Sequence, residues 1–174
     1  KFAEVMERMR KLRADIAPHD SVERFTSLGI DVFLGQGRFT SGDTIEVEGQ
    51  TLKFAKAVIC TGARAAAPPI EGLENVQYLT NETLFSLTEL PSSMGVVGGG
   101  PIGVEMAQTF ARLGSKVTLI VDYGGVIAKE DPDAAVVIKA ALEKDGIEII
   151  SGGRDLSVAK EGDSQIRCSI PEGE

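Results

Sequence analysis

Three glycines near the middle of the chain have the spacing of a phosphate-binding turn. Gly98, Gly100 and Gly103 form the pattern G-x-G-x-x-G within the stretch GVVGGGPIGVEMAQTFARLGSKVTLIVD, residues 95–122. The first glycine of such a pattern permits a tight strand-to-helix turn, the second lets a diphosphate approach the backbone, and the third lets the helix pack close to the strand. The N-terminus of the helix adds unpaired N–H groups and the positive end of its dipole. This chemistry is the binding of a dinucleotide.

Two other interpretations of the turn remain open. A glycine-rich strand-to-helix turn can exist without any ligand, although each glycine costs conformational entropy on folding. Methyltransferases that use S-adenosylmethionine also carry such a turn, but an acidic residue usually lies in the strand before it. Here Val96 and Val97 precede the glycines. The context therefore favours a dinucleotide.

The residues after the following strand bear on which dinucleotide would bind. The apolar run ends at Val121, and Asp122 follows it, 19 residues past Gly103. A carboxylate at this place accepts hydrogen bonds from the ribose 2′-OH of NAD, whereas a nearby arginine suits the 2′-phosphate of NADP. No arginine occurs between Val121 and Ala128. The sequence therefore favours NAD over NADP, with a solvated loop carboxylate as the alternative role of Asp122.

The elements that must position these residues read as a parallel α/β unit. Three apolar runs are typical of strands, and the two amphipathic runs between them are typical of helices. Asp131 is the expected N-cap of the second helix. The strands and helices are expected, in chain order, at residues 94–97, 101–113, 116–121, 132–145 and 147–150. This β-α-β-α-β order predicts a parallel sheet with right-handed crossovers, and a hairpin turning at residues 161–163 should follow it.

The first half of the chain has a different pattern. An apolar stripe at helical spacing covers residues 2–16, and β-rich segments separated by glycine turns follow from Ile30. These segments predict a small antiparallel sheet that leads into a buried strand at residues 57–60. Pro68 and Pro69 then require extended chain.

Composition narrows the range of partners. The 174 residues carry a formal net charge of -8, which disfavours nucleic acid as a partner because an acidic surface repels its phosphates. No apolar stretch reaches the length of a membrane span, and the charged start lacks the core of a signal peptide, so a cytoplasmic location is expected. Cys60 and Cys168 lie far apart and have no metal-ligand spacing.

Two motifs taken together resemble a known family. The segment VICTGARAAAPPIEG, residues 58–72, followed by VVGGGPIGVEMAQTFARLGSKVTLIV, residues 96–121, resembles the pyridine nucleotide-disulfide oxidoreductases. Residues 37–73 and 78–85 are most similar to the mercuric-reductase-like branch of these flavoproteins. The resemblance implies an α/β fold, with a Rossmann-like NAD(P)-binding domain at residues 91–174. The later part of an FAD-binding domain, including the small antiparallel β section, would precede it at residues 1–90.

The resemblance also implies which residues bind cofactors. Thr61 and Gly62 would end a strand beside the flavin, and the backbone of Gly37 would approach the FAD adenine. Glu105 would lie near the nicotinamide, although an acid favoured by the helix dipole in the first turn is the alternative. The residues assigned to NAD or NADP are Gly98, Gly99, Gly100, Pro101, Ile102, Gly103, Glu105, Val121 and Asp122.

Departures from the family pattern define the expected function. The N-terminal FAD fingerprint, the C-x-x-x-x-C redox pair and the C-terminal dimerisation domain do not occur in these residues. Pro101 stands where many members carry an aromatic lid, and Val121 occupies the register of the acidic ribose ligand. The sequence is therefore interpreted as a fragment of a homodimeric, FAD-dependent NAD(P)H oxidoreductase that is inactive alone. The alternatives are a non-catalytic dinucleotide-binding module and a fragment that binds no cofactor.

Overall fold

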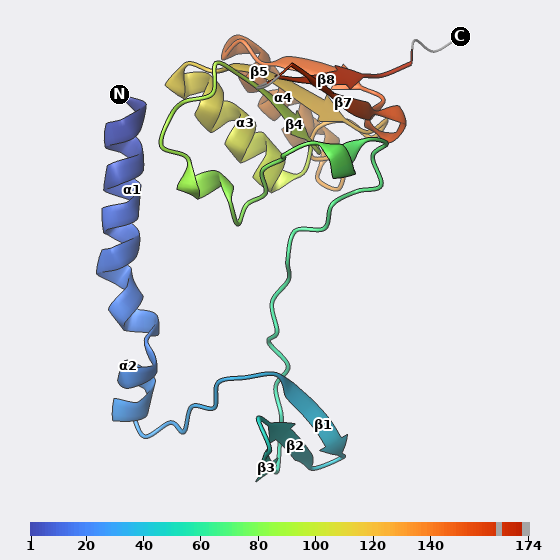
Figure 1. Ribbon diagram of the computed structural model, residues 1–174. Coiled ribbons are helices and arrows are strands. Elements are labelled where there is room, and N and C mark those ends of the chain that lie inside the picture. The colour runs from blue at the N-terminus through green and yellow to red at the C-terminus, as the bar shows by residue number, and fades with distance from the viewer. Residues whose placement is uncertain (163–164, 172–174) are drawn as a thin grey trace. The chain divides into compact units, whose positions relative to one another are not determined.

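The chain folds as two compact units. The computed structural model describes residues 1–162 and 165–171. The larger unit contains residues 1–6 and the chain from Ala65 onward, and the smaller unit contains residues 7–64. Each unit is considered by itself, and most of the helices and strands of both are labelled in Figure 1. The expected α/β class is confirmed, with a parallel sheet in the larger unit and an antiparallel one in the smaller.

A three-stranded parallel sheet forms the centre of the larger unit. Its strands are β4 (Ser93–Val97), β5 (Lys116–Val121) and β6 (Glu148–Ser151), and their spatial order matches their sequence order. The register places Val96 beside Leu119 and Leu119 beside Ile149. The apolar side chains of β5, the central strand, are all buried.

Two helices connect the strands and cover one face of the sheet. The helices are α3 (Pro101–Leu113) and α4 (Pro132–Lys144), both close to their expected bounds. Gln108 and Arg112 of α3 each donate a hydrogen bond of 2.8 Å to Asp145 at the end of α4, so the two helices lie side by side. Asp131 caps α4 by accepting from the Asp133 N–H, as expected. The core between helices and sheet includes Ala107, Phe110, Leu119, Val121 and Leu142.

A hairpin lies against the opposite face of the sheet. It consists of β7 (Ser157–Glu161) and β8 (Gln165–Ser169), with Val158 opposite Cys168. A Cβ on Gly95 of β4 would lie 3.8 Å from the Cys168 sulfur, which places β8 against this face. Of the expected turn, Glu161 and Gly162 are described and Asp163 lies outside the described residues. Three short 3-10 helices complete the unit: η2 (Leu73–Asn75), η3 (Leu84–Ser86) and η4 (Gly153–Asp155).

The smaller unit combines helical segments with an antiparallel sheet. Helix α1 (Phe2–Ile16) starts in the larger unit, and η1 (Ala17–Asp20) and α2 (Val22–Ser27) follow it. The sheet contains β1 (Gly37–Ser41), β2 (Thr44–Val47) and β3 (Gln50–Lys53). This confirms the predicted antiparallel section.

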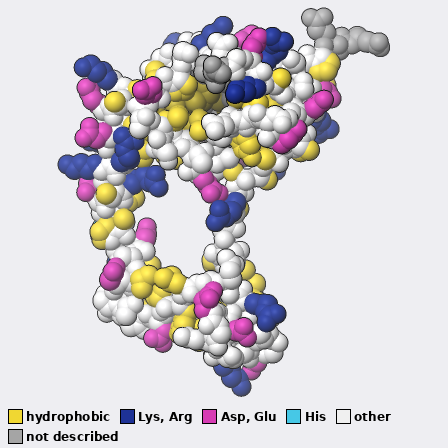
Figure 2. Space-filling model, in the orientation of Figure 1, with side chains coloured by type: hydrophobic (Ala, Val, Ile, Leu, Met, Phe, Trp, Pro, Cys, Tyr) yellow, Lys and Arg dark blue, Asp and Glu magenta, His cyan; other side chains and the backbone are white. Residues whose placement is uncertain are grey.

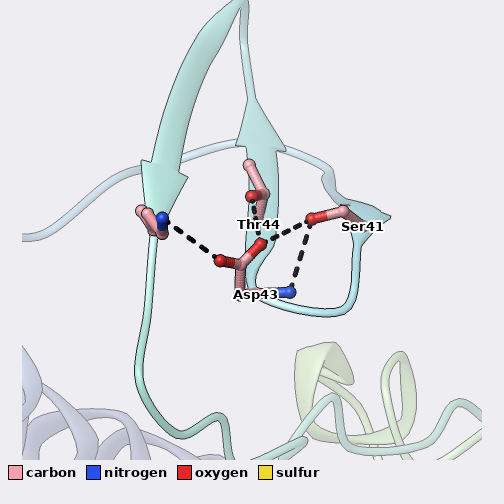
Figure 3. A network of polar contacts seen from close by, with 4 residues as sticks. Ser41, Asp43 and Thr44 are labelled. Atoms are coloured by element: carbon pink, nitrogen blue, oxygen red, sulfur yellow. Dashed lines mark hydrogen bonds and ion pairs between the residues drawn. The ribbon is translucent and has the colours of Figure 1, made fainter.

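A polar network fixes the turn between β1 and β2. Figure 3 shows Asp43 accepting hydrogen bonds from the hydroxyls of Ser41, at 2.8 Å, and Thr44, at 3.0 Å. The Lys53 ammonium lies 3.4 Å from the second carboxylate oxygen. These contacts, the Ser41 hydroxyl first, lower the pKa of Asp43 below its ordinary value. They join the two edge strands of the sheet, β1 through Ser41 and β3 through Lys53, to one carboxylate.

The predicted buried strand at residues 57–60 is wrong. Residues 54–70 contain no strand, and Val58 and Ile59 are 86% and 70% exposed. An apolar run becomes a strand only when a neighbouring strand supplies ladder hydrogen bonds, and none of the described residues pairs with this segment.

The surface carries both signs of charge. Lys and Arg side chains alternate with Asp and Glu side chains over the face of the molecule in Figure 2. Among the described residues, no helix is both long and apolar enough to cross a membrane.

Candidate functional site

The glycine pattern forms the turn between β4 and α3 at the carboxyl end of the sheet. Gly98 has a φ of +112°, a conformation that strains any other residue, and its N–H donates to the Ile120 carbonyl at 2.8 Å. Gly100 is the N-cap of α3. The carboxyl ends of parallel strands are where open α/β sheets bind ligands. The expected strand–turn–helix context is therefore present.

Two of the glycines are required by the packing of the protein itself. A Cβ on Gly103 would overlap the carbonyl oxygen of Gly98, so the helix can approach the turn only with glycine here. A Cβ on Gly99 would lie 2.7 Å from the Gly125 carbonyl oxygen and 2.8 Å from a methyl of Val121. Both distances are shorter than normal contacts, so the backbone of the turn packs directly against the loop after β5.

Gly100 differs because no protein atom requires a glycine at this position. Its φ of -74° is open to every residue, and a Cβ built on it would meet nothing within 4 Å. Such a Cβ would occupy open space in front of the turn. The absence of a side chain therefore leaves room for an external group to reach the backbone.

Several backbone N–H groups of the turn have no acceptor within the described protein. Neither the Gly99 nor the Gly100 N–H donates to another residue in the described part of the chain, and the same holds for Ile102 in the first turn of α3. Pro101 occupies the first helical position, where its missing N–H costs no hydrogen bond. An anion placed here meets free N–H groups and the positive end of the α3 dipole.

The loop after β5 is bonded to the glycine turn. The Ile127 N–H donates to the Gly99 carbonyl at 2.7 Å, and Ile127 itself is 8% exposed. Its φ of +42° is unfavourable for a β-branched residue. Sequence reasoning did not identify Ile127, because neither its strain nor its contact with the turn leaves a local signal.

Asp122 is part of a network of charged side chains at the same sheet end. Its carboxylate accepts from the Tyr123 N–H at 2.8 Å and from Arg154 Nε at 2.7 Å. The Tyr123 hydroxyl donates to Asp155 at 2.8 Å. The Tyr123 N–H, and then Arg154, hold the pKa of Asp122 below its ordinary value, and the pairing with Asp122 raises the pKa of Arg154. Hydrogen bonding to Asp155 raises the pKa of Tyr123.

Arg154 gives Asp122 a basic neighbour, which bears on the choice between NAD and NADP. No arginine lies near Asp122 in the sequence, and the expectation of NAD rests on that. The structure places the Arg154 guanidinium on Asp122 from η4, just beyond β6. In a parallel sheet, the residues that follow adjacent strands lie close together at the carboxyl ends of those strands. The Gly152-Gly153-Arg154 segment after the third strand was therefore the sequence signal for a basic residue near Asp122.

The remaining predicted residues lie in two places. Glu105 is exposed on α3, beyond its first turn, so the first-turn interpretation of this acid is wrong. Val121 is buried, and its side chain packs beside Gly99. Gly37, Thr61 and Gly62 are exposed and belong to the smaller unit. The structure therefore brings together Gly98–Gly103, Val121 and Asp122 at one sheet end.

Comparison with known proteins gives one family over almost the whole chain. The family model described as "Pyridine nucleotide-disulphide oxidoreductase" matches residues 3–173. A mercuric reductase from Bacillus cereus is 34% identical over 157 residues, which are 88% of this chain and 25% of that protein. A dihydrolipoyl dehydrogenase from Acholeplasma laidlawii is 36% identical over 146 residues, which are 82% of this chain and 43% of that protein.

A solved structure supports the same fold. The Cu(II) complex of the HOCl-induced flavoprotein disulfide reductase RclA from Escherichia coli superposes with a TM-score of 0.81 at 29% identity. The match covers 99% of this chain and 40% of that one. The chain thus spans less than half the length of these relatives. Because the sequence match extends over nearly every residue, the chain belongs to the pyridine nucleotide-disulphide oxidoreductase family.

Proposed function

We propose that residues 91–174 form the NAD(P)-binding part of a flavin-dependent NAD(P)H oxidoreductase, and that residues 1–90 belong to its FAD-binding part. In this proposal the glycine turn holds the diphosphate of the nicotinamide dinucleotide, so that the nicotinamide is positioned for hydride transfer. The whole protein would be an enzyme of the mercuric reductase or dihydrolipoyl dehydrogenase type, as the names of its relatives suggest. That it would act as a homodimer is proposed from the resemblance to the family.

The observation that carries the proposal is the open space in front of Gly100. The other glycines of the turn have reasons internal to the protein, namely the positive φ of Gly98 and the tight packing of Gly99 and Gly103. Gly100 has an ordinary φ and no neighbour within 4 Å of a Cβ. A ligand that lies against its backbone explains why a side chain is absent there.

The residues around that space suit a diphosphate. The N–H groups of Gly99, Gly100 and Ile102 are free to donate to phosphate oxygens, and charge-assisted bonds of this kind are the stronger ones. The exposed side chain of Ile102 and the exposed carboxylate of Glu105 follow on the same helix. Fixing the diphosphate limits where the nicotinamide can lie, which is the contribution of orientation to hydride transfer.

The flavin half of the proposal rests on the family alone. A bound flavin supplies the electron-transfer chemistry in such enzymes. The residues assigned to it by resemblance show no fit of the kind seen at Gly100: Gly62 owes its glycine to a φ of +65°, and a Cβ on Gly37 would lie 3.1 Å from Ile45. No step is therefore assigned to Gly37, Thr61 or Gly62.

Titration of NADH and NADPH into the chain, followed by nicotinamide fluorescence, tests the dinucleotide site. Gly100→Val should weaken the binding of both nucleotides at least about tenfold, because its side chain fills the space where the diphosphate lies. Gly42→Val is the matched control, since Gly42 also has open space around a Cβ and no positive φ. This control should bind both nucleotides like the unsubstituted chain.

Three results would contradict the proposal. The first is that the chain binds neither nucleotide. The second is that Gly100→Val binds both with unchanged affinity while its circular dichroism shows a folded protein, and the third is that the Gly42→Val control loses binding to the same extent. The coding sequence on either side of these 174 residues tests the enzymatic part: a C-x-x-x-x-C pair there supports a disulfide-type oxidoreductase, and its absence supports a binding module.

A further inference from the structure

We propose that Arg154 is the residue that recognises the 2′-phosphate of NADPH, so that this site accepts NADPH through a side chain supplied from beyond β6. The inference rests on the proposed dinucleotide site and deepens it, because it names the residue on which coenzyme choice depends. Arg154 lies far from the glycine turn in the sequence, so the sequence alone does not indicate this role.

The Asp122–Arg154 pair lies at the carboxyl end of the strand next to the glycine turn. Asp122 directly follows β5, the strand next to the glycine turn, and this is where a dinucleotide bound in a parallel α/β sheet places its adenosine ribose. Arg154 Nε lies 2.7 Å from the Asp122 carboxylate. The guanidinium therefore lies beside the place that the ribose 2′ substituent would occupy.

The residues on either side of Arg154 hold it there. Gly152 turns the backbone with a φ of +100°, and a Cβ on Gly153 would lie 3.2 Å from the Val121 carbonyl oxygen. The backbone before Arg154 thus packs directly against the end of β5. The hydrogen bond from the Tyr123 hydroxyl to Asp155 ties the same two segments together a second time.

Arg154 has hydrogen-bond donors that its pairing with Asp122 does not use. Asp122 engages only the Nε edge, and within the described residues the two terminal NH₂ groups have no hydrogen-bond partner. The side chain is 74% exposed, so these groups are accessible to a ligand. A planar guanidinium with two free NH₂ groups suits phosphate oxygens.

The two acidic side chains nearby do not rule out a phosphate. Asp122 is paired with Arg154, and Asp155 accepts from Tyr123, so each carboxylate is engaged by a donor within the network. The positive charge of Arg154 offsets the negative charge of Asp122, the nearer carboxylate. Discrimination then depends on Arg154, since a 2′-phosphate gains charge-assisted bonds from it that a 2′-hydroxyl cannot match.

The test is a titration of NADPH and of NADH into the chain and into Arg154→Gln, with dissociation constants measured by nicotinamide fluorescence. Arg154→Gln should weaken NADPH binding about tenfold and change NADH binding by less than about twofold. Asp122→Asn should raise the affinity for NADPH relative to NADH, because it removes the carboxylate that competes for the guanidinium.

Arg112→Gln is the matched control. The exposed Arg112 side chain likewise pairs through its Nε with an aspartate, Asp145, at 2.8 Å, but it joins α3 to α4 away from the glycine turn. It should leave both affinities unchanged. The inference is overturned if Arg154→Gln weakens both nucleotides equally or neither, or if Arg112→Gln has the same selective effect. If the unsubstituted chain binds neither nucleotide, the proposed function fails together with this inference. If it binds them and Arg154→Gln has no selective effect, only this inference fails.

Discussion

Two stretches of the chain have similar composition and different structures. Residues 57–62 read AVICTG, and residues 94–100 read MGVVGGG, so each is an apolar run followed by glycine. The second forms β4 and the glycine turn, paired along its length with β5. The first is exposed chain without regular structure. The difference teaches that such a run becomes a strand because a neighbouring strand pairs with it, and not because it is apolar.

The same contrast holds for the glycines that follow the two runs. A Cβ on Gly62 would meet nothing within 4 Å, whereas a Cβ on Gly103 would overlap the backbone of the turn. Packing therefore constrains the sequence in one region and leaves it free in the other. Three predictions can break or sharpen this comparison.

The largest effect is expected for Gly103→Ala. The added methyl cannot be accommodated unless α3 moves away from the Gly98 carbonyl, so we expect the larger unit to lose more than about 3 kcal/mol of unfolding free energy. Hydrogen exchange of the β5 amides measures this loss within the larger unit. Gly62→Ala is the control and should cost the smaller unit about 1 kcal/mol or less, through its positive φ alone, as measured by hydrogen exchange of the β2 amides. Equal effects of the two substitutions would remove the contrast.

A smaller but substantial effect is expected for Leu119→Ala in β5. Leu119 is 0% exposed, so truncation should cost about 2–5 kcal/mol of unfolding free energy in the larger unit. Ile59→Ala, in the exposed run, should change the unfolding free energy of the smaller unit by less than about 0.5 kcal/mol. Hydrogen exchange of the β5 amides measures the first effect, and exchange of the β2 amides measures the second. A large loss for Ile59→Ala would show that residues 57–60 are buried, contrary to this structure.

The smallest effect concerns the two carboxylates with lowered pKa, one in each unit. Carbon-detected NMR titration should place the pKa of both Asp43 and Asp122 below the ordinary aspartate value. Because the folded-state pKa is lowered, each contribution to stability is present above about pH 4 and is lost as the pH falls through the lowered value.

Arg154→Gln separates these two carboxylates. It should raise the pKa of Asp122 only part of the way, since the Tyr123 N–H is its larger cause, and leave Asp43 unchanged. A shift at Asp43, or no shift at Asp122, would contradict the network described here.

The sequence predicted most of the larger unit because its signals are local. The bounds of α3 and β5 follow from Pro101, Gly114 and the apolar run of β5, and the cap of α4 follows from Asp131. The strand at residues 57–60 failed because pairing depends on a distant partner. Arg154 was missed for the same reason, since its contact with Asp122 joins segments 32 residues apart.

The hydrogen bond from Ile127 to Gly99 has a consequence for the direction of one amide. A trans peptide is planar, so its C=O and the following N–H point in opposite directions. With the Gly99 oxygen turned toward Ile127, the N–H of Gly100 is turned to the other side of that plane. A strained isoleucine thus sets the orientation of a donor in the glycine turn in advance, and binding of the proposed diphosphate would require no rotation of that peptide.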